Sequence, residues 1–129
     1  MTHDDTLYLQ HILDATRQIA EYLDGVSEDE FYRTPLLQDG VIRQLEIIGE
    51  ATRRLSMSWR ERYDHVPWQD IVGMRNKLIH DYFGVDLSTV WVTATRDVPV
   101  LQKWVRHILE DFKNEGSVQE QESGPDRRR

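Results

Sequence analysis

Apolar residues recur at helical spacing along most of the chain, and the alternation typical of strands is absent. The spacing predicts a first helix from about Asp4 to Asp24. Gly25 follows directly, in the position just past a helix end that glycine favours. The residues expected to face inward from this helix are Leu9, Ile12, Leu13, Thr16, Ile19, Ala20 and Leu23.

Two start signals precede a second long helix. Residues 27–30 form a capping box, which predicts a short helical turn of its own. Thr34 and Pro35 then combine an N-cap residue with a proline at the first helical position, and the helix that they open is expected to reach about Met57. Its inward residues would be Leu37, Val41, Leu45, Ile48, Thr52 and Leu55.

The last predicted helix contains a proline within its apolar stripe. Residues 58–66 are predicted as a short helix or loop, and Gly84 separates a third helix from the last one, which Asp86 or Ser88 would cap. The apolar periodicity continues in phase across Pro99, which predicts a kink and not two helices. The inward residues would be Leu87, Trp91, Ala94, Val98, Leu101, Val105, Ile108 and Phe112.

These elements predict an all-α protein, an antiparallel bundle of four to five helices within residues 1–113. Residues 114–129 are polar and lack aromatics, a composition typical of a disordered tail. The absence of cysteine excludes disulfides and thiolate sites. No secretory signal pattern opens the chain and no apolar run approaches the roughly 20 residues that span a bilayer. We therefore expect a cytoplasmic protein without membrane contact.

Arg75 interrupts the apolar face of the third helix, predicted at 68–83. That face is formed by Trp68, Ile71, Val72, Ile79, Tyr82 and Phe83. Arginine is almost never fully buried without a partner, and an unpaired charge in a core is very costly. We therefore expect this face to line a cleft or a subunit interface, with Arg75, Asn76, His80 and Tyr82 gathered there for chemistry. Uncovered tryptophans would add to such an interface; those expected at the surface are Trp59, Trp68 and Trp104.

Spacing alone leaves the roles of Arg75 and His80 open. Asn76 and His80 share a helical face, as do Arg75 and Tyr82, but the five-residue step from Arg75 to His80 turns the helix by about 140°. The two groups can meet one substrate only if the helix ends near His80 or a second subunit completes the site.

A structural role is the alternative. Arg75 would then make an ion pair with Glu46 or Glu50, and His80 would cap the helix end near Gly84. No metal site is predicted, because the other histidines are scattered without ligand spacing; they are His3, His11, His65 and His107.

The formal net charge of −7 argues against broad phosphate binding, which requires many lysine and arginine contacts. Short basic clusters remain, at Arg53 with Arg54, Arg60 with Arg62, and Arg75 with Lys77. A nucleic-acid partner would therefore need a focused basic site.

The segment RNKLIHDY, from Arg75 to Tyr82, resembles the signature of the HEPN superfamily. The resemblance to its HepT-like branch covers nearly the whole folded chain. It includes, in this order, the segments QLEIIGEATRRLS, PWQDIVGMRNKLIHDYF and VDLSTVWVTATRDVPVLQKWV. Arg75, Asn76, His80 and Tyr82 each match the motif.

This resemblance implies a homodimeric helical bundle that dimerises through the motif helix and acts as the toxin of a type VII-like toxin–antitoxin system. It implies a metal-independent ribonuclease without a cofactor, in which Arg75 and His80 of two subunits face one another and Asn76 orients His80 or the phosphate. The partner would be a minimal nucleotidyltransferase antitoxin of the MntA type, which silences the toxin by transferring AMP to Tyr82. Supporting candidates at the site are Glu46, Glu50 and Lys77.

A second hypothesis is a non-catalytic HEPN module that binds a nucleotide or RNA and serves mainly as partner and substrate of the nucleotidyltransferase. The acidic net charge favours this hypothesis, and the intact motif favours the ribonuclease.

Overall fold

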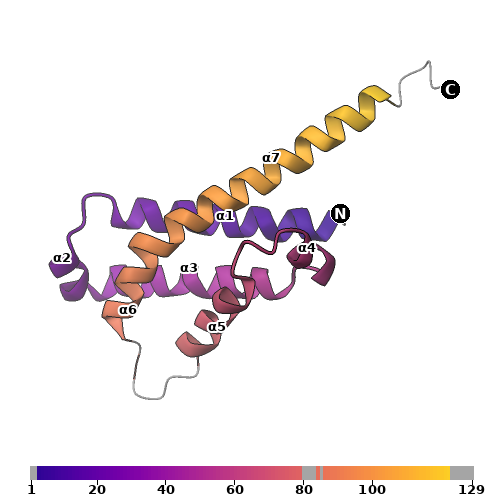
Figure 1. Ribbon diagram of the computed structural model, residues 1–129. Helices are drawn as coiled ribbons and strands as arrows, with labels where there is room; N and C mark the ends of the chain where they lie inside the picture. The colour runs from indigo at the N-terminus through magenta and orange to yellow at the C-terminus, as the bar shows by residue number, and fades with distance from the viewer. Residues whose placement is uncertain (1–2, 80–83, 85, 123–129) are drawn as a thin grey trace.

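The computed structural model describes residues 3–79, 84 and 86–122, with the side chains of 3, 75–79 and 116–122 left out of the description. In this part of the chain every regular element is a helix (Figure 1). The elements are α1 His3–Leu23, α2 Glu28–Arg33, α3 Pro35–Arg53, α4 Met57–Arg62, α5 Trp68–Ile79, α6 Leu87–Val92, the π-helical segment η1 Thr93–Asp97, and α7 Val98–Glu122. The prediction of an all-α fold is confirmed.

Four long helices form the bundle and run in alternating directions (Figure 1). The central helix α3 packs along α1 on one side and along α5 on the other, while α7 crosses α1 obliquely. The short helices α2 and α4 lie at the two ends of α3. No helix in the described part of the chain is long and apolar enough to cross a bilayer.

The predicted inward stripes form the core. Residues buried as predicted include Leu9, Ile12, Ile19, Val41, Leu45, Ile48, Thr52, Leu55, Ala94, Val98, Leu101, Val105 and Ile108. The prediction that Ala20 faces inward is wrong, because its side chain is exposed at the edge of a groove between α1 and α7.

Two of the three predicted N-cap residues, Ser27 and Asp86, cap their helices as expected. The Ser27 hydroxyl accepts a hydrogen bond from the Glu30 N–H at 3.1 Å, and Gly25 has the positive φ of 73° expected just past α1. Thr34 differs, since its hydroxyl donates to the Glu30 carbonyl of α2 at 2.7 Å and makes no cap bond to α3. Pro35 still begins α3.

Helix α3 ends at Arg53 and not near Met57, which instead begins α4. Arg60 of α4 reaches back and donates from Nη2 to the last carbonyls of α3, those of Thr52 at 2.9 Å and Arg53 at 2.7 Å. These bonds satisfy carbonyls that a helix end leaves without partners. The apolar spacing continues through Leu55, so it could not show that α3 ends at Arg53.

A buried carboxylate fixes the turn between α3 and α4. Asp5 of α1 is 2% exposed. Its two oxygens accept from the N–H of Ser56 at 2.8 Å and from the hydroxyl of Ser56 at 2.9 Å. Ser56 is the N-cap residue of α4, so α1 positions the start of α4 directly.

The helix that contains Pro99 remains continuous from Leu87 to Glu122, as predicted, and its distortion is a π turn. The wider turn at Thr93–Asp97 comes immediately before the proline, whose ring would clash with the carbonyl four residues earlier in an α-helix. Asp86 is the cap. It accepts from the Ser88 N–H at 3.0 Å and from nearby hydroxyls, and these bonds hold its pKa below the usual value.

Residues 114–122 continue α7 as helix, which corrects the prediction of a disordered tail over these residues. Glu115 forms an ion pair with Arg62 of α4. The Arg62 guanidinium also lies 5.4 Å from the centre of the Trp59 ring and 5.3 Å from that of Tyr63. These contacts connect α7 to α4 beyond residue 113. Residues 123–129 lie outside the described chain, so the predicted domain boundary stays a prediction.

Two of the tryptophans expected at the surface are buried. Trp59 stacks on Tyr63 with ring centres 4.9 Å apart, and Trp68 donates from Nε1 to the Tyr63 carbonyl at 3.0 Å. Trp104 alone of the three is partly exposed. The surface-tryptophan argument for a dimer is therefore wrong for Trp59 and Trp68.

We predict that Asp5→Ala lowers the free energy of unfolding by about 2 kcal/mol, because two partly buried donors of Ser56 lose a charged acceptor. Urea denaturation monitored by circular dichroism measures this. Asp4→Ala is the matched control, since Asp4 is exposed on the same turn and its loss should change stability by less than about 0.5 kcal/mol. Equal effects of the two substitutions would contradict the role given to Asp5.

Candidate functional site

The motif lies at the C-terminal part of α5, the helix that packs on α3. Arg75, Asn76 and Lys77 belong to this helix, but their side chains are outside the description. His80 and Tyr82 lie outside the described residues altogether. Their proposed roles, and any contact of Arg75 with Glu46 or Glu50, therefore stay predictions.

The described part of the α5 face is only half covered by its own chain. Trp68 at the start of the helix is buried, whereas Ile71 and Val72 in the next turn are partly exposed. An apolar helix face that faced a complete core would be buried throughout. This agrees with the expectation that the face carrying Arg75 lines a cleft or an interface.

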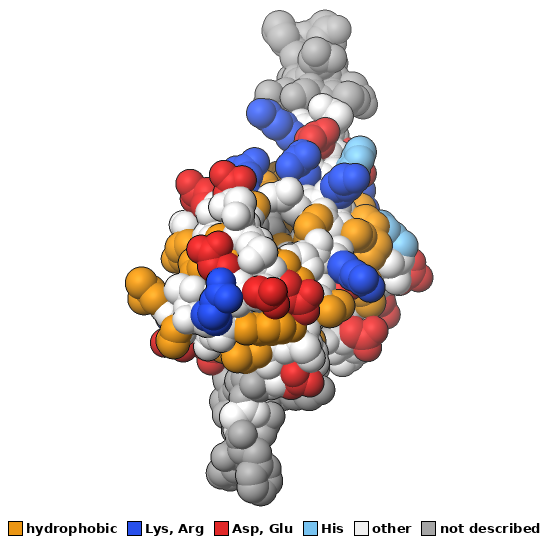
Figure 2. Space-filling model, turned by 90° about the vertical axis from the view of Figure 1, so that its left-hand side faces the viewer, with side chains coloured by type: hydrophobic (Ala, Val, Ile, Leu, Met, Phe, Trp, Pro, Cys, Tyr) orange, Lys and Arg blue, Asp and Glu red, His pale blue; other side chains and the backbone are white. Residues whose placement is uncertain are grey.

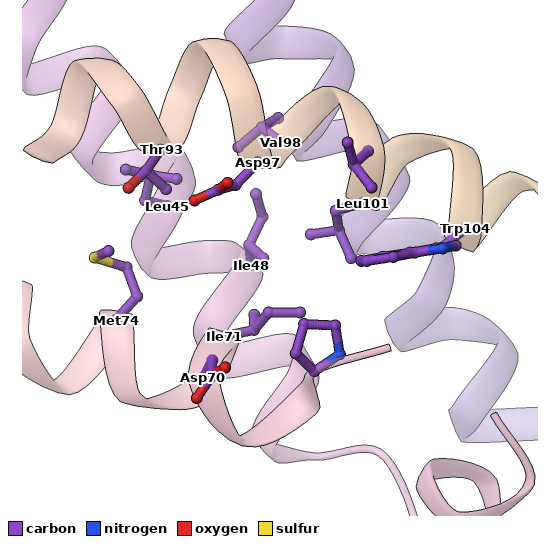
Figure 3. Close-up of a pocket in the computed structure, with 12 residues that line it drawn as sticks. Leu45, Ile48, Asp70, Ile71, Met74, Thr93, Asp97, Val98, Leu101 and Trp104 are labelled. Atoms are coloured by element: carbon purple, nitrogen blue, oxygen red, sulfur yellow. The ribbon is translucent and has the colours of Figure 1, made fainter. Parts of the chain in front are cut away.

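A cavity of about 350 Å³ opens beside this face, between α5, α3 and the junction of η1 with α7 (Figure 3). Its lining is mostly apolar and consists of Leu45, Ile48, Pro67, Asp70, Ile71, Met74, Thr93, Asp97, Val98, Val100, Leu101 and Trp104. Cavities of this size and character accommodate apolar groups. The π turn contributes Thr93 and Asp97 to the wall, a feature that apolar periodicity could not reveal.

The polar groups of this cavity are acidic. Asp70 comes from α5 and Asp97 from the opposite wall, as Figure 3 shows, and both are exposed. Among the described lining residues there is no cation to balance them. Because two carboxylates repel a phosphate, the cavity suits an apolar protein segment better than an RNA backbone.

Glu50, a supporting candidate on α3, is bound by two neighbouring arginines. It accepts from Arg53 Nη2 at 2.9 Å and from Arg54 Nε at 3.1 Å. The second contact joins residues four apart on α3, a spacing that places two side chains next to each other on a helix. The hydrogen bond from Arg53 to Glu50 raises the pKa of Arg53.

Glu46 is partly buried one turn before Glu50. It borders a groove of about 330 Å³ between α1 and α3, whose other polar residues are Tyr8, His11, Arg43, Glu50 and Arg54. The hydrogen bond from Arg54 to Tyr8 is the main cause that raises the pKa of Arg54, and the hydrogen bond to Glu50 raises it further. Cations and carboxylates alternate here, so this groove is not a concentrated basic site.

The basic clusters noted in the sequence are largely structural where their side chains are described. Arg53 and Arg54 bind Glu50, while Arg60 caps α3. Arg62 binds Glu115. Within the same described part, no group of three His, Cys, Asp or Glu side chains is placed to hold a metal ion.

Comparison with known proteins places this helical chain in a family. A family model described as ribonuclease HepT-like matches residues 12–108. A protein of Methanocaldococcus jannaschii named "Gamma-glutamylcyclotransferase and putative RNase" is 44% identical over 87% of this chain, and the chain spans only half of that relative's length.

Two further relatives are matched over nearly their full length. A "Putative RNase" of Caldanaerobacter subterraneus subsp. tengcongensis is 43% identical over 82% of this chain and 95% of its own. A "Probable ribonuclease HepT" of Thermococcus cleftensis is 38% identical over 78% of this chain and 90% of its own. No solved structure matches the chain significantly.

The family match covers α3, α5 and the π turn together with the Arg75 motif, which are the elements that form the half-covered face. This chain therefore belongs to the ribonuclease HepT-like family.

Proposed function

We propose that this protein is a metal-independent ribonuclease and the toxin of a type VII-like toxin–antitoxin system, acting in the cytoplasm. The observation that carries the proposal is an intact Arg75–His80 motif on a helix whose apolar face one chain leaves half covered. Membership of the ribonuclease HepT-like family supports RNA as the substrate.

The residue types suit RNA cleavage at a site shared by two subunits. One His80 removes the proton from a ribose 2′-hydroxyl, and the 2′-oxygen attacks the adjacent phosphorus. The bond from phosphorus to the 5′-oxygen breaks, and the second His80 donates a proton to that leaving oxygen. Arg75 provides a permanent charge for the pentacoordinate phosphate, and Asn76 orients His80 or the phosphate. The products are a 2′,3′-cyclic phosphate and a 5′-hydroxyl.

A second copy of the chain is the proposed cover for the α5 face. Ile71 and Val72 are half-exposed on the side of α5 that carries Arg75. Burying them against a partner would remove apolar surface from water and place two motifs near one another.

We predict that His80→Ala lowers the rate of RNA cleavage by about a hundredfold or more, because it removes both the general base and the general acid. The measurement is cleavage of a labelled RNA in the presence of EDTA. His11→Ala on the exposed side of α1 is the matched control and should cleave at the wild-type rate. Unchanged cleavage by the His80 variant would show that the activity comes from elsewhere.

The same assay decides between the ribonuclease and the non-catalytic module. If the wild-type protein binds RNA but leaves it intact with and without divalent metal ions, the protein is a binding module and a substrate for its nucleotidyltransferase. Cleavage that requires a metal ion would contradict the metal-independent mechanism.

We predict a homodimer at micromolar concentration that Val72→Glu converts to a monomer with little ribonuclease activity, because a buried glutamate in an apolar contact costs several kcal/mol. Sedimentation equilibrium measures the mass. Leu36→Glu is the control for an added surface charge, since Leu36 is 82% exposed at the start of α3. Thermal melting separates dissociation from unfolding, and a wild-type monomer would contradict the shared site.

We further propose that a minimal nucleotidyltransferase of the MntA type silences the protein by AMP transfer to Tyr82. The Tyr82 oxygen attacks the α-phosphorus of ATP and pyrophosphate leaves. The added phosphodiester then competes with RNA for Arg75.

Two of the described tyrosines, Tyr32 and Tyr63, are poor alternatives to Tyr82. Tyr63 is buried, and this burial raises its pKa. Tyr32 is exposed, but its hydroxyl donates to Glu28 at 2.6 Å, and this hydrogen bond is the main cause that raises its pKa to about 12. A tyrosine held by a carboxylate is a weaker nucleophile and repels the anionic triphosphate.

We predict that Tyr82→Phe abolishes AMP incorporation when the protein is incubated with its nucleotidyltransferase, ATP and magnesium, whereas Tyr32→Phe leaves it unchanged. Peptide mass spectrometry locates the modification. Label on another tyrosine, or full modification with undiminished RNA cleavage, would overturn this mode of silencing.

A further inference from the structure

The outer side of the last helix carries four exposed cations. Arg96 lies in η1, and Lys103, Arg106 and Lys113 follow in α7. Their spacing of seven, three and seven residues keeps them within an arc of about 100° of an α-helix, opposite the buried stripe. From Arg96 to Lys113 this basic stripe extends over about 25 Å.

These side chains have no ion-pair partner among the described residues. The other described basic clusters are bound within the fold, to Glu50, to the end of α3 and to Glu115. Figure 2 shows lysine and arginine side chains gathered below the C-terminal end of α7, with an acidic side chain among them and a histidine beside them. Exposed Glu110 falls within the same arc, so the stripe carries four cations and one carboxylate and has a net positive charge in a chain of net charge −7.

Aromatic rings border the same surface. Trp104 is partly exposed and lies between this surface and the cavity beside α5, whose wall it also forms. The exposed His65 ring meets it edge to face with centres 6.1 Å apart. Proteins that bind single-stranded nucleic acid combine a row of cations for the phosphates with aromatic rings on which bases stack. A purely electrostatic contact with an acidic protein would have no use for the exposed tryptophan.

We infer that this basic stripe is a binding track for single-stranded RNA, which holds the substrate on the outer side of α7 while the motif cleaves it. The inference rests on the proposed ribonuclease function. Arg96 lies ten residues after Asp86, the cap of α6, so the stripe begins about 15 Å along the helix from Asp86. The acidic cavity beside α5 repels phosphate, which keeps the strand on the outer face.

The test uses a fluorescent single-stranded RNA with 2′-O-methyl riboses, which binds but lacks the attacking hydroxyl. Fluorescence anisotropy measures its affinity between about 50 and 200 mM KCl. In the stripe variant, Lys103, Arg106 and Lys113 are each replaced by Gln. In the matched control, Arg17, Arg33 and Arg43 are each replaced by Gln, which removes the same charge from exposed positions on other helices.

We expect the stripe variant to bind roughly tenfold more weakly. We also expect its slope of log affinity against log salt to become shallower by about 2, near 0.7 for each lost phosphate contact. The control variant should remain within about twofold of wild type, and Trp104→Ala should weaken binding without changing the slope, because it removes stacking and no charge. Circular dichroism melting of each variant reports on folding.

Two outcomes overturn the inference. If the stripe variant and the control bind RNA equally well, the stripe is not an RNA track and an acidic protein becomes its partner. If the stripe variant and the control variant both bind RNA more weakly than wild type and by the same factor, the overall charge and not the stripe determines the affinity. Cleavage of unmodified RNA is measured separately. A wild-type protein that binds through the stripe but never cuts contradicts the ribonuclease proposal, while the binding data still support the track.

Discussion

The placement of the motif helix depends on how α3 is brought to an end. Arg60 satisfies the final carbonyls of α3, and Asp5 holds Ser56 at the start of α4. Both contacts are short, and Asp5 is almost completely buried. Together they turn the chain after Arg53, so that α5 can return along α3. If α3 continued, α5 would begin elsewhere and the Arg75 face would lose its position.

A second consequence of this turn is the incomplete cover over α5. Trp68 is anchored in the core by its bond to the Tyr63 carbonyl, but the following turns are only half buried. The cavity beside them has a mostly apolar lining with two carboxylates, Asp70 and Asp97. Contact with an apolar partner and binding of phosphate therefore require different surfaces. The apolar face suits a second copy of the chain, while phosphate binding requires cations elsewhere.

The charge distribution resolves an apparent conflict between an acidic chain and an RNA substrate. Most of the basic pairs evident in the sequence are used inside the fold, where they bind carboxylates or helix carbonyls. Four cations without an ion-pair partner among the described residues lie along one side of η1 and α7, whereas Arg17, Arg33 and Arg43 are distributed over α1, α2 and α3. A net charge averages over the whole surface, whereas phosphate contacts depend on the local arrangement of side chains.

The sequence by itself determined the helical class, the inward stripes and most of the helix starts, because periodicity and capping are local properties of neighbouring residues. It also identified Arg75 as out of place on an apolar face, and the family match is consistent with that prediction. Whether His80 and Tyr82 act as predicted lies beyond the residues that the structure describes.

Only the tertiary structure decided where α3 ends, that Trp59 and Trp68 are buried, and which arginines are already bound. Each of these depends on contacts between residues distant in the chain, such as Asp5 with Ser56 and Arg62 with Glu115. The distortion before Pro99 was partly predictable: the proline in the sequence predicted a kink, but only the structure showed that it is a π turn at Thr93–Asp97. Spacing along one helix specifies which side is apolar, but the partner that covers that side is fixed by packing in three dimensions.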